Sequence, residues 1–141
     1  MGVAGDAETS GGGRIVVIAE SVVFNGFSAP LSANGMPYLT LDQSPYQEVG
    51  GSGGYIYVNT TNKFLPNLLS KDISIESKGG FGTSGGSGGV IVLEGLFFLD
   101  DSQVIAVGGS STNKSQIASG CGDGAAGTVY TKSNNYTRLV V

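Results

Sequence analysis

The sequence contains no histidine, no tryptophan and only one cysteine among its 141 residues. Without histidine, the proton shuttles, serine–histidine pairs and histidine metal ligands of many enzymes are excluded. The single cysteine, Cys121, allows no disulfide within the chain, so it is either a free thiol or a partner in a bond between chains. Much of the usual catalytic chemistry is therefore absent before any motif is considered.

Charge is also scarce, because Asp, Glu, Lys and Arg together make up 13% of the chain, about half the usual share of roughly 25%. Seven scattered basic residues and a net charge of -4 offer no positive surface to a nucleic-acid backbone. No run reaches the roughly 18 apolar residues of a membrane span, and no secretion signal opens the sequence. With 40% hydrophobic residues, the composition is that of a folded chain.

Glycine, by contrast, supplies 25 of the 141 residues, more than twice the usual share of about 7%. The glycines have no three-residue period, which excludes collagen, and they alternate with β-branched runs. The high glycine content and the β-branched runs both disfavour helix. The sequence therefore predicts an all-β protein.

A glycine-rich loop followed at once by an apolar strand occurs four times. The four copies are Gly11–Ile18, Gly51–Val58, Gly86–Leu93 and the weaker Gly124–Thr131. Their spacing is irregular, at roughly 35 to 41 residues, which lies in the range of repeat proteins. We expect a single domain over residues 1–141, with repeats at 14–54, 55–89, 90–127 and an incomplete 128–141.

Two further elements recur behind the first strand. Short strands that end at a turn glycine align without gaps at Leu31–Gly35, Ile75–Gly79 and Val104–Gly108, and apolar middle segments lie at Val22–Phe24, Leu68–Leu69 and Leu96–Leu99. Three strands per repeat predict a right-handed parallel β-helix, or solenoid, of about three to four coils with Gly-rich loops. An antiparallel β-sandwich or jelly roll with Gly-rich hairpins remains the alternative.

Alternation along the first strand assigns its two faces. The inward positions form two ladders of similar residues, namely Ile15, Ile56, Ile91, Val129 and Val17, Val58, Leu93, Thr131. The outward face begins apolar and becomes polar along its length. Glycines are expected at the corners, where the backbone needs positive φ.

These repeats resemble the Gly-rich, pectin-lyase-like parallel β-helix repeats of large cell-surface and adhesin proteins. The residues that carry the resemblance are Gly50–Gly54 with Tyr55–Val58, Gly85–Gly89 with Val90–Leu93, and Ser32–Gly35. The resemblance implies a right-handed parallel β-helix and an extracellular setting, and it does not imply an enzyme.

The two ends suggest assembly. The last repeat has a strand at Thr128–Lys132 and a second at Tyr136–Val141, whereas the first residues look like the tail of a third strand. We expect head-to-tail stacking into a filament, with Val140 and Val141 at the joint. The alternative is a fragment of a longer repeat protein whose neighbours cap it. The leading hypothesis is an extracellular structural protein, a self-assembling subunit of a surface fibre.

Two kinds of surface residue are candidate sites. Acceptor sequences for N-linked glycan begin at Asn59, Asn113 and Asn135. The outward tyrosines Tyr55, Tyr57 and Tyr130 can stack on sugar rings or pack against another chain, unless residues 36–47 cover them. A carbohydrate-binding or adhesin module is therefore the second functional hypothesis.

No catalytic, metal or cofactor site is expected. Asp100 and Asp101 are the one adjacent carboxylate pair, and they fit a solvated turn better than the acid and base of a polysaccharide-processing enzyme. Asp6 and Asp123 stand singly in Gly loops, too few for calcium. No Gly-Lys-Ser/Thr follows the glycines, which excludes a P-loop.

Overall fold

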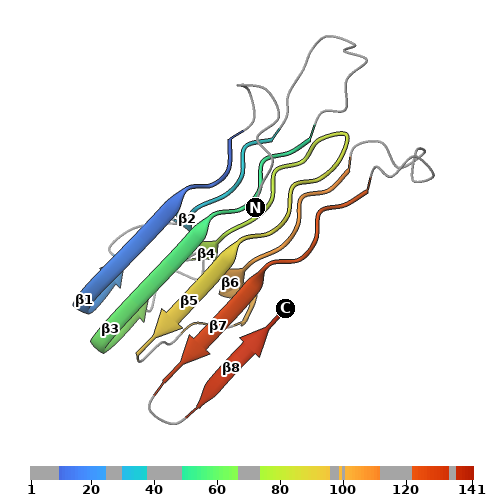
Figure 1. Cartoon of the computed structure of the whole chain (residues 1–141). Coiled ribbons are helices and arrows are strands. Elements are labelled where there is room, and N and C mark those ends of the chain that lie inside the picture. Colours follow the sequence, from blue (N-terminus) through green and yellow to red (C-terminus); the bar gives the residue numbers. More distant parts are fainter. Residues whose placement is uncertain are drawn as a thin grey trace.

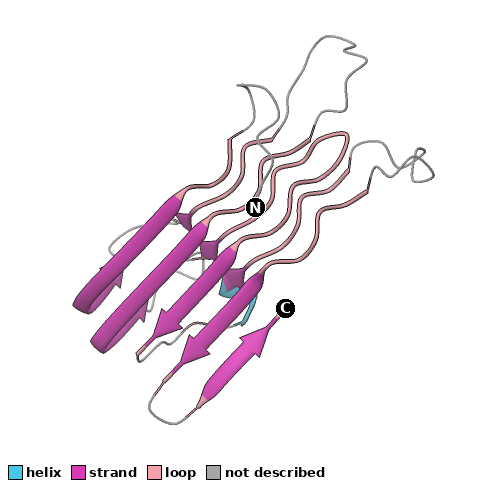
Figure 2. Ribbon diagram, in the orientation of Figure 1, coloured by secondary structure: helices cyan, strands magenta, loops and turns pink. Residues whose placement is uncertain are grey.

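The computed structural model describes residues 10–24, 30–37, 49–66, 74–95, 99, 101–111, 122–133 and 136–141. In these residues the chain is almost entirely strand, with one 3-10 turn beside β6 (Figure 2). The elements are β1 (Arg14–Phe24), β2 (Leu31–Ser32), β3 (Tyr55–Pro66), β4 (Ile75–Glu76), β5 (Val90–Glu94), the 3-10 turn η1 (Asp101–Gln103), β6 (Val104–Ile105), β7 (Thr128–Lys132) and β8 (Thr137–Val140). The expected all-β class is confirmed.

The strands form two sheets that the chain visits in turn. The larger sheet has the order β1-β3-β5-β7-β8 and the smaller has the order β2-β4-β6. In Figure 1 the small sheet forms a second row behind the large one. Every ladder between successive repeats is parallel, and β7 with β8 is the one antiparallel pair among the described strands. Parallel pairing between repeats is not the arrangement of an antiparallel sandwich.

The pairing register is the one that the repeat alignment predicts. Ile15 pairs with Ile56, Ile56 with Ile91, and Ile91 with Val129. In the small sheet Leu31 pairs with Ile75, which pairs with Val104. Similar side chains therefore stack in ladders, because each repeat places the same position of its strand over the one before.

The hydrophobic core lies between the two sheets, and its residues are most fully buried in the middle of the stack. The fully buried residues of the core are Ala33, Ile56, Val58, Ile75, Ile91 and Leu93. Residues at the two ends of the stack, such as Ile15 on β1 and Val104 on β6, pack against this cluster but are only partly buried. The core therefore has two open ends in the described part of the chain.

The predicted middle strand at Val22–Phe24 is wrong, because these residues continue β1. Strand β3 has 12 residues against the 11 of β1, and the two strands stay paired as far as Phe24 with Pro66. The register shifts between Ala19 and Ser21, where β3 advances one residue more than β1, as at a β-bulge. The middle segment predicted at Leu68–Leu69 lies outside the described residues, as do residues 96–98 of the segment predicted at Leu96–Leu99.

The C-terminal strand also departs from expectation. The sequence predicts Tyr136–Val141 as the second strand of a further, incomplete coil. Instead β8 turns back and pairs antiparallel with β7 in the large sheet, Val129 opposite Val140 and Lys132 opposite Thr137. The close return after Ser133, whose amide donates to the Tyr136 carbonyl (2.9 Å), makes the antiparallel hairpin the nearest available pairing.

The Gly-rich segments are ordered, extended chains rather than loose loops, and they run as a stack beyond the strands (Figure 2). The segments that lead into β3 and β5 repeat their hydrogen-bond directions every three residues. In the segment that leads into β3, the amides of Gly50 and Gly53 donate to Ser84 and Ser87 of the segment that leads into β5. The amides of Gly51 and Gly54 donate instead to Met36 and Ala33 of the segment that follows β2 (2.8–3.0 Å for all four bonds). A three-residue period is that of a polyproline II-type helix.

The segments that lead into the large sheet are also hydrogen-bonded to the segments that follow the strands of the small sheet. The Gly80 amide donates to Gly51, Gly86 to Gly80, Gly109 to Gly86 and Gly124 to Gly109, at 2.7 to 2.9 Å. A Cβ on Gly86 would overlap the carbonyl oxygens of Gly50 and Gly51. These segments therefore approach so closely that a side chain cannot fit between them.

This packing corrects the reason given for the glycines. Positive φ was expected at the corners, but among the described glycines only Gly13 (71°) and Gly95 (124°) have it. At most of the other positions the limit is the neighbouring backbone, as at Gly86. Glycine is required here because neighbouring segments of the backbone approach closely, and glycine has the same role at the axis of the collagen triple helix.

Candidate functional site

The outer face of the large sheet carries the side chains that were predicted to bind. Three outward ranks cross β1, β3, β5 and β7 in register, and they consist of Arg14, Tyr55, Val90, Thr128; then Val16, Tyr57, Val92, Tyr130; then Ile18, Asn59, Glu94, Lys132. The burial of β3 alternates as expected, with Ile56 and Val58 buried and the tyrosines on either side partly exposed. Tyr55 and Tyr57 therefore lie on the face opposite to Ile56 and Val58, and Tyr130 pairs in register with Val92 of the same rank.

The first rank holds a cation–π contact. The Arg14 guanidinium carbon lies 5.5 Å from the centroid of the Tyr55 ring. At an exposed site such a contact is worth about 0.5–1 kcal/mol. Tyr55 is thus already engaged by a side chain of the neighbouring strand, and it is a poorer platform for a ligand than Tyr57.

Tyr57 belongs to a hydrogen-bonded cluster. Its hydroxyl donates to Oε2 of Glu94 (2.7 Å), and Nδ2 of Asn59 donates to the Tyr57 hydroxyl (3.1 Å) and to the same Oε2 (3.3 Å). The Asn59 bond alone would lower the pKa of Tyr57, but the bond to Glu94 and its negative charge outweigh it and raise the pKa above the ordinary 10.0. The hydroxyl therefore stays protonated and donates to Glu94 at neutral pH.

A polar groove of about 340 Å³ adjoins this cluster. It is lined by Asn59, Thr60, Thr61, Glu94, Gly95, Lys132 and Ser133. The groove arises because β5 ends at Glu94 and β7 at Lys132, whereas β3 continues to Pro66. Gly95, with φ of 124°, takes the chain out of the sheet, and its amide donates to the Lys132 carbonyl (2.9 Å).

The groove contains one buried hydroxyl without a partner and two opposite charges that do not pair with each other. Thr60 is 2% exposed, and its hydroxyl has no hydrogen-bond partner in the described part of the chain. Glu94 and Lys132 are in register on neighbouring strands, yet no ion pair joins them. An unpaired buried hydroxyl costs about 1–3 kcal/mol, so the groove holds unspent hydrogen-bonding capacity.

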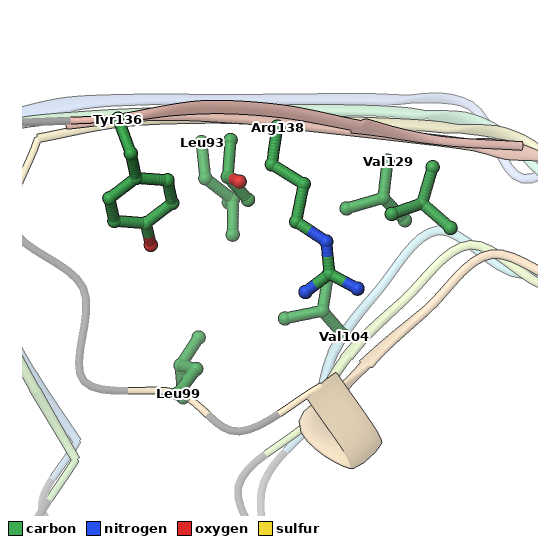
Figure 3. Close-up of a pocket in the computed structure, with 8 residues that line it drawn as sticks. Leu93, Leu99, Val104, Val129, Tyr136 and Arg138 are labelled. Carbon is green, nitrogen blue, oxygen red and sulfur yellow. The ribbon is translucent and has the colours of Figure 1, made fainter.

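A second cavity, of about 110 Å³, lies at the C-terminal end of the core. It is lined by Leu93, Leu99, Val104, Val129, Thr131, Tyr136, Arg138 and Val140. Figure 3 shows Tyr136 and Arg138 reaching from the large sheet into the space above Leu99 and Val104. The cavity exists because the large sheet extends by β7 and β8 beyond β6, where the small sheet ends.

The small sheet has a polar cluster of its own around Glu76. Its carboxylate forms an ion pair with Lys78 (3.0 Å) and accepts hydrogen bonds from Ser74 (2.8 Å) and Asn34 (3.3 Å). Burial would raise the pKa of Glu76, but these partners together outweigh burial and leave the pKa below the ordinary value. The Lys78 amide also donates to Oδ1 of Asn34 (2.7 Å), so the cluster ties neighbouring repeats together.

The remaining sequence candidates are distributed as follows. Val140 lines the end cavity, whereas Val141 is 80% exposed. Asp123 accepts a hydrogen bond from the Ser111 amide (2.6 Å). Asp101 begins the 3-10 turn. Asn113, Asn135, Cys121, Asp6, Asp100 and residues 38–47 lie outside the described residues.

Sequence reasoning missed the groove itself. The available signal was that Asn59, Glu94 and Lys132 stand at the same outward position of their repeats. What it could not supply was the unequal length of the strands, which opens the sheet beside Thr60. It also missed Arg138, although alternation with Val140 already placed both on one face of the last strand.

No protein-family model, curated protein or solved structure matches this chain. Among the described residues, no helix has the length and apolar character needed to cross a membrane. The same residues contain no group of three or more acidic or cysteine side chains placed to hold a metal ion.

Proposed function

We propose that this chain is an extracellular structural protein whose repeats form a right-handed parallel β-helix, a subunit of a surface fibre or filament. The proposal of a β-helix is supported by the alternation of the chain between two sheets and by the parallel, in-register stacking of successive repeats. Such a stack shares one core among units that cannot fold alone, and its length is set by the number of units.

The observation that carries the proposal is the edge of β1 that no described strand covers. This strand is 11 residues long and forms one edge of the large sheet. Its exposed side chains include Val16 (46%), Ile18 (74%) and Val23 (55%). A long, apolar edge strand presents unpaired N–H and C=O groups and is a template for a further strand.

The direction of the backbone groups supports this view. The Tyr55 amide donates to the Gly13 carbonyl, so the groups of Gly13 face β3. Because bonds alternate along a parallel strand, the N–H groups of Arg14, Val16 and Ile18 point to the open edge. A second chain placed there would satisfy them and would also cover the partly buried Ile15 and Val17 at that end of the core.

The opposite end offers the complementary surface. Val104, Val129 and Val140 line open space beside β6 and β8. Strand β8 runs against the other strands of its sheet, so a copy that continues the stack in the same orientation would meet β8 antiparallel. Such a contact is heterologous and does not close, and it therefore builds a filament rather than a dimer.

We test the proposal with a charge placed on the open edge. Val16→Lys is expected to weaken self-association at least about tenfold, because lysine on an edge strand blocks pairing. The measurement is sedimentation velocity over a dilution series, with negative-stain electron microscopy of the concentrated sample. Unchanged association in Val16→Lys would reject assembly through β1.

Val92→Lys is the matched control. Val92 stands in the same outward rank as Val16, but its strand β5 is paired on both sides. The same charge on the same face should therefore leave association within about twofold of the unmodified chain. If both variants weaken association equally, the outer face rather than the edge is the contact surface.

The extracellular setting is supported by the acceptor sequences at Asn59, Asn113 and Asn135. Asn59 uses its amide nitrogen for bonds to Tyr57 and Glu94, so a glycan there has to be attached before this cluster forms. We expect intact-mass and glycopeptide spectrometry of native material to show glycan on at least one of the three. Unmodified asparagine at all three would remove this support.

The proposed role is not enzymatic. Three carboxylates of the described residues are used within the fold, Glu76 by Lys78, Glu94 by Tyr57 and Asp123 by the Ser111 amide. None forms the facing pair that polysaccharide hydrolysis needs.

A further inference from the structure

We propose that the groove beside Tyr57 binds an uncharged sugar ring, with the ring stacked on Tyr57 and its hydroxyls bound by Glu94, Asn59 and Lys132. The groove is separate from the edge of β1, because β3, β5 and β7 supply its lining. The inference therefore does not rest on filament formation.

The position of Tyr57 makes it a platform. Tyr57 is in the second outward rank, while its hydrogen-bond partners Asn59 and Glu94 are both in the third. Positions two residues apart on a strand are separated by about 6.6–6.8 Å, so the Tyr57 hydroxyl has to extend about that far along the strand to reach its partners. The aromatic ring therefore lies along the sheet instead of standing away from it. A flat aromatic face beside hydrogen-bonding groups is suited to the apolar face of a sugar.

The polar groups next to this platform match hydroxyls rather than a charged ligand. The bonds from Tyr57 and Asn59 both end on Oε2 of Glu94, which leaves Oε1 available. Asn59 likewise donates through Nδ2 and keeps Oδ1. Lys132 adds a donor of opposite charge to Glu94, so the two charges of the groove cancel. Sugar hydroxyls both donate and accept, and they are able to use acceptors and donor together.

The size of the groove also fits a sugar. A volume of about 340 Å³ lies at the lower end of the roughly 300–1,000 Å³ of small-molecule sites, which suits one monosaccharide unit. Thr60 lines the same groove, but its hydroxyl oxygen is buried, so the outward groups of Asn59, Glu94 and Lys132 supply the contacts to the sugar.

The test uses the full chain made in a host that adds no N-linked glycan, so that Asn59 stays free. An array of immobilised glucose-, mannose- and galactose-containing oligosaccharides, with sialylated and sulfated ones beside them, identifies the class bound. Titration calorimetry with the best neutral oligosaccharide then gives affinities. We expect neutral glycans to bind, and Tyr57→Ala and Glu94→Gln each to weaken binding about tenfold or more.

Tyr130→Ala is the matched control, because Tyr130 stands in the same rank as Tyr57, whereas Tyr57 is the one hydrogen-bonded to Glu94 and Asn59 of the groove lining. It should change affinity less than about twofold. Glu94→Gln keeps the shape of the side chain and serves if Tyr57→Ala does not fold, as judged by circular dichroism. Preference for sialylated or sulfated glycans, no neutral glycan retained at millimolar concentration, or equal losses in Tyr57→Ala and Tyr130→Ala would each overturn the proposal.

Discussion

Gly86→Ala is expected to lower the free energy of unfolding by about 3 kcal/mol or more. A Cβ at this position would overlap the carbonyl oxygens of Gly50 and Gly51. The same residue also holds two repeats together, because its amide donates to Gly80 (2.9 Å) and its carbonyl accepts from Gly109 (2.7 Å). Relief of the overlap has to move backbone, not a flexible side chain. Urea unfolding followed by circular dichroism measures the loss as a shift of midpoint.

Gly122→Ala is the control for this prediction. Gly122 lies in the same kind of segment, but a Cβ there has nothing within 4 Å, and its φ is not in the left-handed region. Alanine should leave the midpoint unchanged or raise stability by up to about 1 kcal/mol, because it restricts the unfolded chain. If Gly86→Ala were as stable as Gly122→Ala, the glycine segments would not be packed as closely as the structure has them.

Ile91→Ala is expected to cost about 3–4 kcal/mol. Ile91 has no exposed surface, and it lies in the ladder between Ile56 and Val129. Truncation removes buried methylene groups and leaves a cavity that the neighbouring strands cannot close, since parallel ladders hold them on both sides. Equilibrium urea unfolding at a concentration where the chain is monomeric gives this value.

Ile15→Ala provides the comparison within the same ladder. Ile15 pairs with Ile56 but belongs to the edge strand and is only partly buried. The expected loss in the monomer is about 1–2 kcal/mol. If the chain associates through β1, the loss should grow at concentrations where filaments form, because Ile15 then becomes buried. A loss equal to that of Ile91→Ala in the dilute monomer would mean that the core is not open at this end.

The repeat and its register were open to prediction because they rest on local patterning. Alternating apolar residues place Ile56 and Ile91 inside whichever sheet they join, and a recurring Gly-rich segment before each strand fixes where the strand begins. Residues at the same position of each repeat then meet by stacking. The tyrosine face follows from the same alternation.

Other features depend on how many residues of each strand are paired, and the sequence alone does not reveal that number. Strand β1 runs on through Val22 because β3 continues beside it, and the groove at Thr60 opens because β5 does not. The last strand pairs antiparallel with β7 in the large sheet instead of continuing a coil.

By itself, the sequence determined the β class, the stacked ladders and the two faces of the main strands, because each is set by the residues of one repeat and its period. Only the tertiary structure decided the purpose of the glycines, which is visible when Gly86 meets Gly51 across the stack. It also decided which outward side chains become a site, since Tyr57, Asn59 and Glu94 are joined by contacts between repeats. Such contacts depend on distances between segments far apart in the chain, and those distances exist only once it is folded.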